Sequence, residues 1–464
     1  MVQSNSIEVI DHFQISPPQG AVPATASIPL SFLDMLWLLC RPMQRLFFYD
    51  FPHPIPYLMQ NILPSLTTSL SLTLQHFYPF AGNLAYPPPP LKPHIVFTNS
   101  DSIPFTVAQT TTVDFNEIIR DHVRDVRELH PLVPKLPPSR STQDGTRMLP
   151  LLAVQLTLFP NLGLCIGFAF QHVAGDGVAF NHFVKFWAFV FRSSELTHVE
   201  KWLPCLDRGI LKDPREVESH FLKACWEGAP PGDHNIDATQ DDSSLADKVR
   251  ATFRISKENI EKLKRQVSDH TLGQLHASTF TVTSAIIWVA LIKTEGYEAG
   301  VLPDVDKPCY FDFPVDCRER LEKKVPNNYF GNCVGVCFVP ARRGELLGDN
   351  GIVVAAKTIG EKIKEFIEGG VLRDAETWLT TWKEMHAEGK SLFSVASSPR
   401  LRVYETDFGW GRPKKSEVVH VDSTEAVSIS DCRDGGGGVE IGLALTRSKM
   451  DVFTVVFEQH LKQM

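Results

Sequence analysis

The sequence predicts an α/β protein of two domains. The chain has 464 residues, more than a single hydrophobic core usually supports. Apolar runs typical of strands alternate with segments whose apolar residues recur every three or four positions, as they do in amphipathic helices. Residues 226–248 are acidic, polar and rich in glycine, proline and serine, which is typical of a linker. We therefore expect an N-terminal domain at residues 1–225 and a C-terminal domain at residues 249–464.

The composition excludes several classes of protein. Hydrophobic residues make up 43% and charged residues 22% of the chain, which are ordinary values for a globular protein. The formal net charge of −8 argues against nucleic acid as a partner, because such binders need a basic face. The chain begins without a basic segment followed by an apolar core, and it has no run of about 18 apolar residues. We expect a cytosolic protein without a membrane partner.

Nine cysteines are scattered along the chain, most of them inside apolar runs. No CxxC pair occurs, and the pair Cys333 and Cys337 has no companion cluster with zinc spacing. We expect free, buried thiols in a reducing compartment and no metal site.

The first half predicts strands, one long helix and two exposed loops. Residues 7–10 indicate a strand, which ends at Ser16-Pro17-Pro18. Residues 61–75 predict an amphipathic helix with Pro64 in its first turn. The proline-rich segments 87–93 and 134–145 predict loops.

A hairpin predicted at residues 149–170 turns at Pro160-Asn161-Leu162-Gly163. Its second strand leads directly into Gln171-His172-Val173-Ala174-Gly175-Asp176-Gly177. Apolar residues at helical spacing follow Gly177, so His172 should lie between a strand and a buried helix.

The second half predicts another alternation of strands and helices. Ser256 is placed to cap a helix that ends near Val267, and a second helix, buried, should begin after Ser278. Residues 407–413 predict a loop. The remaining elements are strands at 249–255, 310–315, 334–339, 427–430 and 439–445, and a final element from about residue 449.

His172 is the candidate general base. A neutral imidazole can take a proton from a hydroxyl that attacks an activated carbonyl. The competing interpretation is a hydrogen-bonded core histidine, since HxxxD patterns recur by chance. Asp176 could orient His172 as in a hydrolase triad. Alternatively, Gly175 and Gly177 permit backbone angles that direct this carboxylate toward an arginine elsewhere.

Metal and covalent chemistry find little support. His182 follows the motif, but no HExxH pattern or cysteine cluster accompanies it. No GxSxG sequence occurs, and no cysteine has the sequence signature of a nucleophile. Direct attack by a bound acceptor is the simpler hypothesis.

Four ordered motifs resemble those of the plant BAHD acyl-CoA-dependent acyltransferases. They are Leu70 to Gly82, His172 to Gly177, Tyr329-Phe330-Gly331-Asn332-Cys333 and Asp407-Phe408-Gly409-Trp410-Gly411. The resemblance extends over essentially the whole chain. The third motif resembles that of the anthocyanin and phenolic-glucoside acyltransferase clade.

The resemblance implies two chloramphenicol acetyltransferase-like domains with mixed sheets and helices, and a substrate channel at their interface. It implies that His172 is the catalytic base and that Asp176 pairs with Arg318 as a structural residue. Asp407 is either a second catalytic acid or structural, within a structural loop that includes Gly409, Trp410 and Gly411. The implied residues for CoA and acyl binding are Arg45, Lys262, Lys264, Ser278, Thr279, Ser397 and Ser398. From spacing alone, Lys262 and Lys264 could instead solvate a helix face.

The activity implied is acyl transfer, in a ternary complex and by a monomer, from acyl-CoA to a hydroxyl of a flavonoid, anthocyanin or simple phenolic glucoside. No cofactor is needed, because acyl-CoA is a co-substrate. The segment Val395-Ala396-Ser397-Ser398-Pro399 departs from the Thr-Ser-Trp of shikimate-acylating relatives, so the group that meets the oxyanion is open.

Malonyl-CoA is the favoured donor and a p-coumaroyl or caffeoyl donor the alternative. A malonyl carboxylate could be met by Arg45 or Lys185. Each could instead be an ordinary solvated or locally paired cation. An acyl-CoA hydrolase and an inactive ligand-binding homologue are the remaining alternatives.

Overall fold

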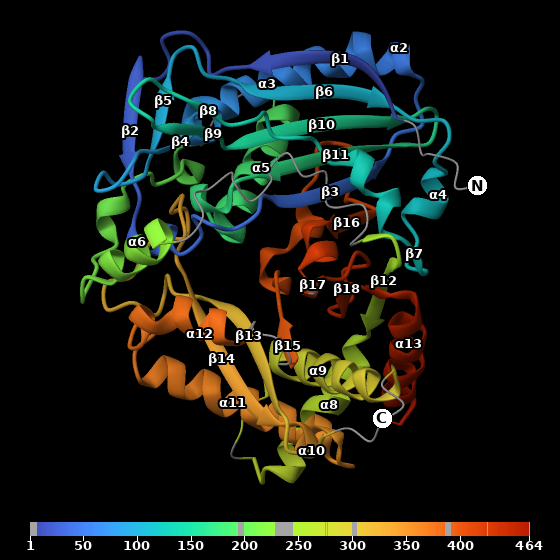
Figure 1. The fold of residues 1–464 in the computed structure, drawn as a ribbon. Coiled ribbons are helices and arrows are strands. Elements are labelled where there is room, and N and C mark those ends of the chain that lie inside the picture. The colour runs from blue at the N-terminus through green and yellow to red at the C-terminus, as the bar shows by residue number, and fades with distance from the viewer. Residues whose placement is uncertain are drawn as a thin grey trace.

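The computed structural model describes residues 7–193, 199–227, 245–273, 275, 277–298, 304–385, 391–424 and 426–463. Four sheets and their helices form two halves, drawn at the top and bottom of Figure 1. Most of the predicted linker, residues 228–244, lies outside the described residues. The division at 226–248 therefore stays a prediction.

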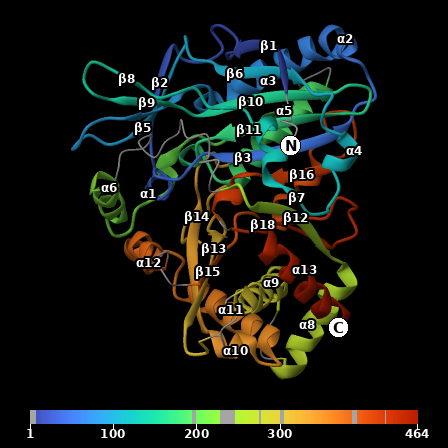
Figure 2. The same ribbon diagram turned by 45° about the vertical axis from the view of Figure 1, so that its right-hand side comes forward.

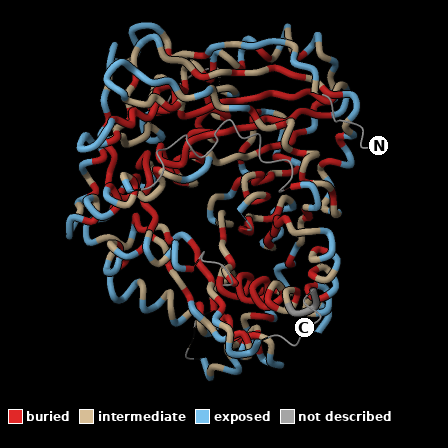
Figure 3. Tube along the Cα trace, in the orientation of Figure 1, coloured by how far each residue is buried: buried red, intermediate tan, exposed pale blue. Residues whose placement is uncertain are grey.

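A six-stranded sheet dominates the first half. Its order is β1 (Glu8–Ile15), β6 (Ile103–Gln109), β10 (Leu152–Phe159), β11 (Gly163–Phe170), β3 (Met43–Asp50) and β16 (Lys415–Val418). β10 and β11 form the predicted hairpin and are buried at every residue, as the red trace of Figure 3 shows. The helices α3 (Leu63–His76) and α5 (Gly177–Arg192) pack together, and Trp187 of α5 lies against Phe168 of the sheet.

A five-stranded sheet flanks this layer. Its order is β2 (Thr25–Pro29), β5 (His94–Thr98), β4 (Asn83–Tyr86), β9 (Arg147–Pro150) and β8 (Arg140–Ser141). The shorter helices of this half are α1 (Phe32–Met35), α2 (Ile55–Tyr57), α4 (Phe115–Ile118) and α6 (Val217–Glu227).

The second half has two smaller sheets around one buried helix, α9 (Thr279–Glu298) (Figure 2). The sheets are β14 (Val334–Arg342), β13 (Pro308–Asp316) and β15 (Ser391–Ser394), and β17 (Ser428–Asp431), β18 (Val439–Thr446), β12 (Lys248–Ile255) and β7 (Arg124–Asp125). The other helices are α8 (Lys257–His270), α10 (Arg343–Leu347), α11 (Gly351–Glu368), α12 (Trp378–Met385) and α13 (Arg447–Lys462). Ser256 caps α8 as predicted, accepting from the Asn259 amide at 3.2 Å.

The halves exchange strands, which the sequence does not predict. β16 comes from the second half but pairs with β3, and β7 comes from the first half but pairs with β12. Figure 1 shows the orange-red β16 beside the blue β3. The main apolar core of the first half also includes residues of the second, such as Phe330 and Tyr404. Each half is therefore completed by the other.

Candidate active site

His172 lies where β11 ends and α5 is about to begin, in a single turn formed by His172–Ala174. The residue is 9% exposed, and the Trp37 ring stacks on the imidazole with ring centres 4.0 Å apart and planes 9° from parallel. Nδ1 is buried without a hydrogen-bond partner. Burial lowers the pKa of His172 below its usual range, so the ring is neutral near pH 7. A neutral imidazole with a fixed plane is what a general base requires.

Asp176 points away from this imidazole and holds the turn in place. Its Oδ1 accepts hydrogen bonds from the amides of Val178 and Ala179, at 3.0 Å each, and so caps α5. Arg318 contacts both carboxylate oxygens, at 2.9 Å and 3.0 Å. Burial alone would raise the pKa of Asp176, but the pairing with Arg318 outweighs it and holds this pKa below its usual range. The carboxylate is thus a buried anchor between the two halves.

The glycines of the turn act by size rather than by conformation. Gly175 has φ 174°, an extended angle open to any residue, so the prediction that its backbone freedom turns Asp176 away is wrong. A Cβ on Gly175 would lie 2.9 Å from the Ala179 side chain, and one on Gly177 would lie 3.2 Å from Leu401. Ala179 packs too closely for a side chain at Gly175, whereas the tight contact at Gly177 requires only a small shift of the Leu401 side chain.

Asn332, from the third motif, holds the His172 turn through hydrogen bonds to its backbone. Its Nδ2 donates to the carbonyl oxygens of His172 at 3.0 Å and Val173 at 3.3 Å, and also to Asp34 Oδ1 at 2.9 Å. Asp34 pairs in turn with Arg208 at 3.3 Å, and Arg208 donates to the Ala174 carbonyl at 3.0 Å. These side chains are buried and joined to the His172 turn by hydrogen bonds, which makes them a rigid support, while Arg208 Nε and Asn332 Oδ1 have no partner among the described residues.

The rest of the third motif serves the same support. Gly331 leaves room for Arg208, since a Cβ there would overlap the guanidinium. The Tyr329 hydroxyl lies 3.4 Å from Arg208 Nη1, and the Cys333 amide donates to Asp176 Oδ2 at 2.9 Å. The motif of the second half therefore holds the His172 turn of the first in place.

Asp407 is far from His172. It pairs with Arg192, the last residue of α5, at 3.6 Å, whereas His172 precedes the first residue of that helix. The 16 residues of α5 separate its ends by about 24 Å. Leu401, Glu405 and Asp407 contact Asn181, Lys185 and Arg192 in turn, so this segment follows α5 away from His172. Asp407 is not placed to exchange a proton with the imidazole.

The fourth motif is a closed loop around the Asp407 carboxylate. Oδ1 accepts from the amides of Gly409 at 2.6 Å and Gly411 at 3.0 Å. These glycines have φ 97° and 84°, in the left-handed region that other residues rarely adopt. Trp410 packs against Tyr49 and other aromatic rings of the first half. This geometry favours the structural alternative for Asp407.

Arg45 and Ser397, both predicted for CoA and acyl binding, are brought together. Arg45 lies on β3 opposite Phe168 of β11, and its guanidinium donates to Ser397 Oγ at 3.3 Å and to Ser416 Oγ at 3.2 Å. Burial lowers the pKa of Arg45 to about 10. In the part of the chain that the structure describes, no carboxylate forms an ion pair with it. Lys185 differs, since it pairs with Glu405 at 3.5 Å.

The other residues predicted for CoA lie in the second half. Lys262 is exposed on α8, and Lys264 there pairs with Glu261 at 2.8 Å. Ser278 accepts from the Thr281 amide at 3.1 Å and so caps α9, next to a half-buried Thr279. Ser398 caps the turn after β15, accepting from the Arg400 amide at 3.3 Å. Their role toward CoA stays a prediction.

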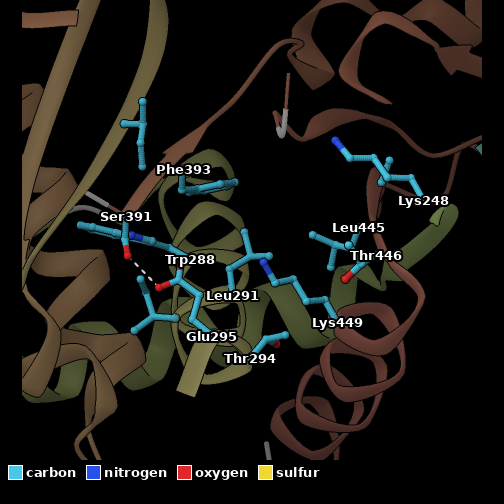
Figure 4. Close-up of a pocket in the computed structure, with 13 residues that line it drawn as sticks. Lys248, Trp288, Leu291, Thr294, Glu295, Ser391, Phe393, Leu445, Thr446 and Lys449 are labelled. Carbon is cyan, nitrogen blue, oxygen red and sulfur yellow. Dashed lines mark hydrogen bonds between the residues drawn. The ribbon is translucent and has the colours of Figure 1, made fainter. Parts of the chain in front are cut away.

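A pocket in the second half contains none of these residues. It lies at the C-terminal end of α9, between Phe393 of β15, Leu445 of β18 and Lys449 of α13 (Figure 4). The Glu295 carboxylate on its wall already bonds Ser391 at 2.7 Å and pairs with Arg343. The geometry assigns this pocket no ligand.

Sequence reasoning missed the residues that surround His172 from outside the motifs. Trp37, Asp34 and Arg208 occupy isolated positions, without a spacing that marks them. Only Asn332 lay within a recognised motif, and its role was not assigned. The one available signal was an acidic or basic residue inside an apolar run, as at Asp34.

The described residues contain neither a metal-binding cluster nor a membrane-spanning helix. No group of three or more histidine, cysteine, aspartate or glutamate side chains is arranged to hold a metal ion within the described ranges. None of the helices described here has the length and apolar character to cross a membrane. All nine cysteines are free, and seven are buried, whereas Cys40 is exposed and Cys205 half-buried.

Comparison with known proteins identifies the family. A model of the Transferase family matches residues 5–460. The chain belongs to this family. Coumaroyl-CoA:anthocyanidin 3-O-glucoside-6''-O-coumaroyltransferase 1 of Arabidopsis thaliana is 37% identical over 469 residues, with 98% of each chain covered. Malonyl-coenzyme A:anthocyanin 3-O-glucoside-6''-O-malonyltransferase of Dahlia pinnata is 35% identical, again over 98% of each chain. The predicted resemblance to BAHD acyltransferases is confirmed.

The fold agrees with a solved member of the same structural class. The crystal structure of vinorine synthase superposes with a TM-score of 0.64, at 22% identity, over 96% of both chains. The predicted mixed α/β fold is confirmed. At this level of sequence identity the comparison shows a shared fold and not a shared function.

Proposed function

We propose that this transferase moves an acyl group from acyl-CoA to a hydroxyl of an anthocyanin, flavonoid or simple phenolic glucoside. The observation that carries the proposal is His172, held neutral and in one plane by burial and by Trp37. The names of the relatives, a coumaroyltransferase and a malonyltransferase of anthocyanin-type glucosides, supply the substrate class.

The chemistry follows from an imidazole of this kind. His172 takes the proton of the acceptor hydroxyl as its oxygen bonds to the thioester carbonyl carbon. The carbon–sulfur bond then breaks, and the imidazolium returns the proton to the departing CoA thiolate. Holding both substrates against one base removes much of the entropic barrier, worth several kcal/mol. In this proposal Asp176, Arg318 and the Asp407 loop position the site and take no proton.

Malonyl-CoA is the donor that the charges favour. Arg45 is a half-buried cation whose hydrogen-bond partners are the hydroxyl groups of Ser397 and Ser416, so it can bind the free carboxylate of a malonyl group. An aromatic acyl group offers no such charge. Lys185, the other cation considered, is already paired with Glu405. The coumaroyl donor of the Arabidopsis relative is the second candidate.

The proposal includes a monomer that acts in the cytosol. His172, Asp176 and Arg318 all come from one chain, so the site needs no second copy. Free cysteines are typical of a reducing compartment. The predicted CoA residues Lys262, Lys264, Ser278, Thr279 and Ser398 are retained here as a proposed surface for the donor.

Donor and acceptor assays with the purified protein test this function. We expect malonyl-CoA and a glucoside acceptor to give acylated glucoside and free CoA in equal amounts. Loss of thioester at the same rate without acceptor would indicate a hydrolase, and acceptor binding without transfer would indicate an inactive homologue.

Substitution of Arg45 tests the donor. Arg45→Leu should lower kcat/KM for malonyl-CoA by about 10- to 100-fold, the usual cost of a lost hydrogen bond to a charged group. Lys185→Met is the matched control and should change it less than threefold. An equal loss with p-coumaroyl-CoA in Arg45→Leu would contradict the carboxylate assignment.

A further inference from the structure

A second histidine, His420, lies at the edge of the six-stranded sheet near His172. β16 pairs with β3 as far as Val418 opposite Arg45, and the Val419 amide then donates to the Gln44 carbonyl at 3.1 Å. The next contact of this ladder comes from a side chain. The Gln44 amide donates to Nδ1 of His420 at 3.2 Å, where a backbone carbonyl would otherwise accept.

This contact fixes the tautomer of His420. A backbone N–H can only donate, so Nδ1 must be the unprotonated nitrogen and the ring proton must lie on Nε2. The Gln44 carbonyl accepts from Val419 and lies 3.4 Å from Nδ1, which is the longer of the two contacts that Nδ1 makes. The sheet edge therefore presents an Nε2–H donor in a set direction.

The imidazole also stays neutral. Burial lowers the pKa of His420 to about 3; the Gln44 carbonyl, which can accept from a protonated ring, opposes this, and the nearby charges of His172, Arg45 and Arg250 add to it. At any pH near neutrality, His420 is a neutral donor and does not compete with His172 for a proton.

The strand pairing places His420 beside the reaction centre. Gln44 of β3 is paired with Ala169 of β11, and two residues beyond Ala169 the chain reaches Gln171 and then His172. His172 is also among the groups that lower the pKa of His420, which agrees with this placement. His420 is half-buried, and no hydrogen bond joins its Nε2 to any of the residues that the structure describes.

We infer that the Nε2–H of His420 donates a hydrogen bond to the thioester carbonyl oxygen of the bound acyl-CoA. This role rests on the proposed acyl transfer. The oxygen becomes an oxyanion when the acceptor attacks, and a donor already in place stabilises it without reorganising. No proton is transferred and no bond of His420 changes.

Kinetics of three variants test the role. His420→Ala should lower kcat by about 100-fold, as expected for the loss of one oxyanion donor, with KM for malonyl-CoA changed less than threefold. His420→Gln can place an amide N–H near the position of Nε2 and should recover at least tenfold over alanine. His420→Asn is too short to reach that position and should not.

The control and the contrary outcomes follow from the same segment. Ser423→Ala removes the hydroxyl that bonds the His420 carbonyl at 3.1 Å, and it should leave kcat unchanged. The thermal midpoint of each variant identifies loss of folding. A folded His420→Ala enzyme with kcat within threefold of the wild type would overturn the inference, as would an effect on KM alone.

Nitrogen NMR of ¹⁵N-histidine-labelled protein tests the state of His420 apart from activity. The resonances lost in His420→Gln should report a neutral ring with its proton on Nε2 from pH 5 to pH 8. A ring that titrates near pH 6.5, or one with its proton on Nδ1, would overturn the inference even if acyl transfer is found. Absence of transfer in the wild type would instead remove the proposed function on which the role depends.

Discussion

At the scale of single residues, the site is built around an imidazole that burial keeps unprotonated. Trp37 covers one face of His172, and Asn332 binds the carbonyl of the same residue. Neither contact takes the ring proton, so the base is held by stacking and by its backbone. Position and protonation state are thus set by different neighbours.

The pH dependence of kcat/KM follows from this burial. The active form is the neutral ring, and burial places the pKa of His172 below 6.5. Activity should stay constant from pH 8 to pH 6.5 and fall tenfold per pH unit only below the lowered pKa. A pH–rate profile checks this expectation. An acidic limb that begins above pH 7 would show that the base is not a desolvated imidazole.

Asp176→Asn should destabilise the fold. It leaves Arg318 buried against a neutral amide, a change that typically costs about 3–5 kcal/mol. The folded-state pKa of Asp176 is lowered, so its contribution is present above the unfolded pKa and is lost as pH falls through the folded value. Denaturant unfolding of the wild type and of Asp176→Asn measures the difference in their free energies of unfolding. This difference should be largest at pH 7 and should become smaller below pH 4. A difference in the free energy of unfolding that is unchanged at pH 2 would contradict an ionised Asp176 paired with Arg318.

At the scale of elements, helix and strand patterns in the sequence predicted α3, α5, α8, α9 and the β10–β11 hairpin. The short β16 could not be predicted, because Lys415, Ser416 and Glu417 read as an exposed polar segment. In the folded chain Lys415 is buried and pairs with Asp121 at 2.6 Å and Glu417 at 3.3 Å. Partners that are distant in sequence decide the burial of such residues, so local periodicity carries no signal for them.

The Asp407 loop gives a prediction at this scale. Asp407→Asn keeps an oxygen that can accept from Gly409 and Gly411, and it should retain kcat within about threefold. Asp407→Ala loses both contacts and should lower stability by about 1–3 kcal/mol. Thermal unfolding and steady-state assays measure the two effects. If folded Asp407→Asn lost as much kcat as a variant without its general base, Asp407 would instead be a second catalytic acid.

At the scale of the whole molecule, the His172 turn belongs to one half and most of the residues that hold it belong to the other. The sequence predicted the Asp176–Arg318 pair through family resemblance, and in the structure the two side chains lie 2.9 Å apart. It did not predict the exchange of β16 and β7. Buried ion pairs also join the exchanged segment to the second sheet, with Arg250 2.6 Å from Glu417 and 2.9 Å from Asp422.

A nicked chain tests this interdependence. A protease recognition sequence inserted between residues 227 and 245 would allow the chain to be cut between the described elements α6 and β12. Because strands and ion pairs cross between the halves, the two fragments should co-elute in native size-exclusion chromatography and keep most of the acyl transfer activity. Separation of the fragments without denaturant would show that the halves are independent.

The central claim is that His172 accepts the proton of the acceptor hydroxyl. The most direct test compares kcat/KM for acylation of a glucoside by malonyl-CoA between the wild type and His172→Ala, with the thermal midpoint as the measure of folding. A folded variant slowed by about two to four orders of magnitude is the predicted result. A folded variant within a few-fold of the wild type would remove His172 from the mechanism.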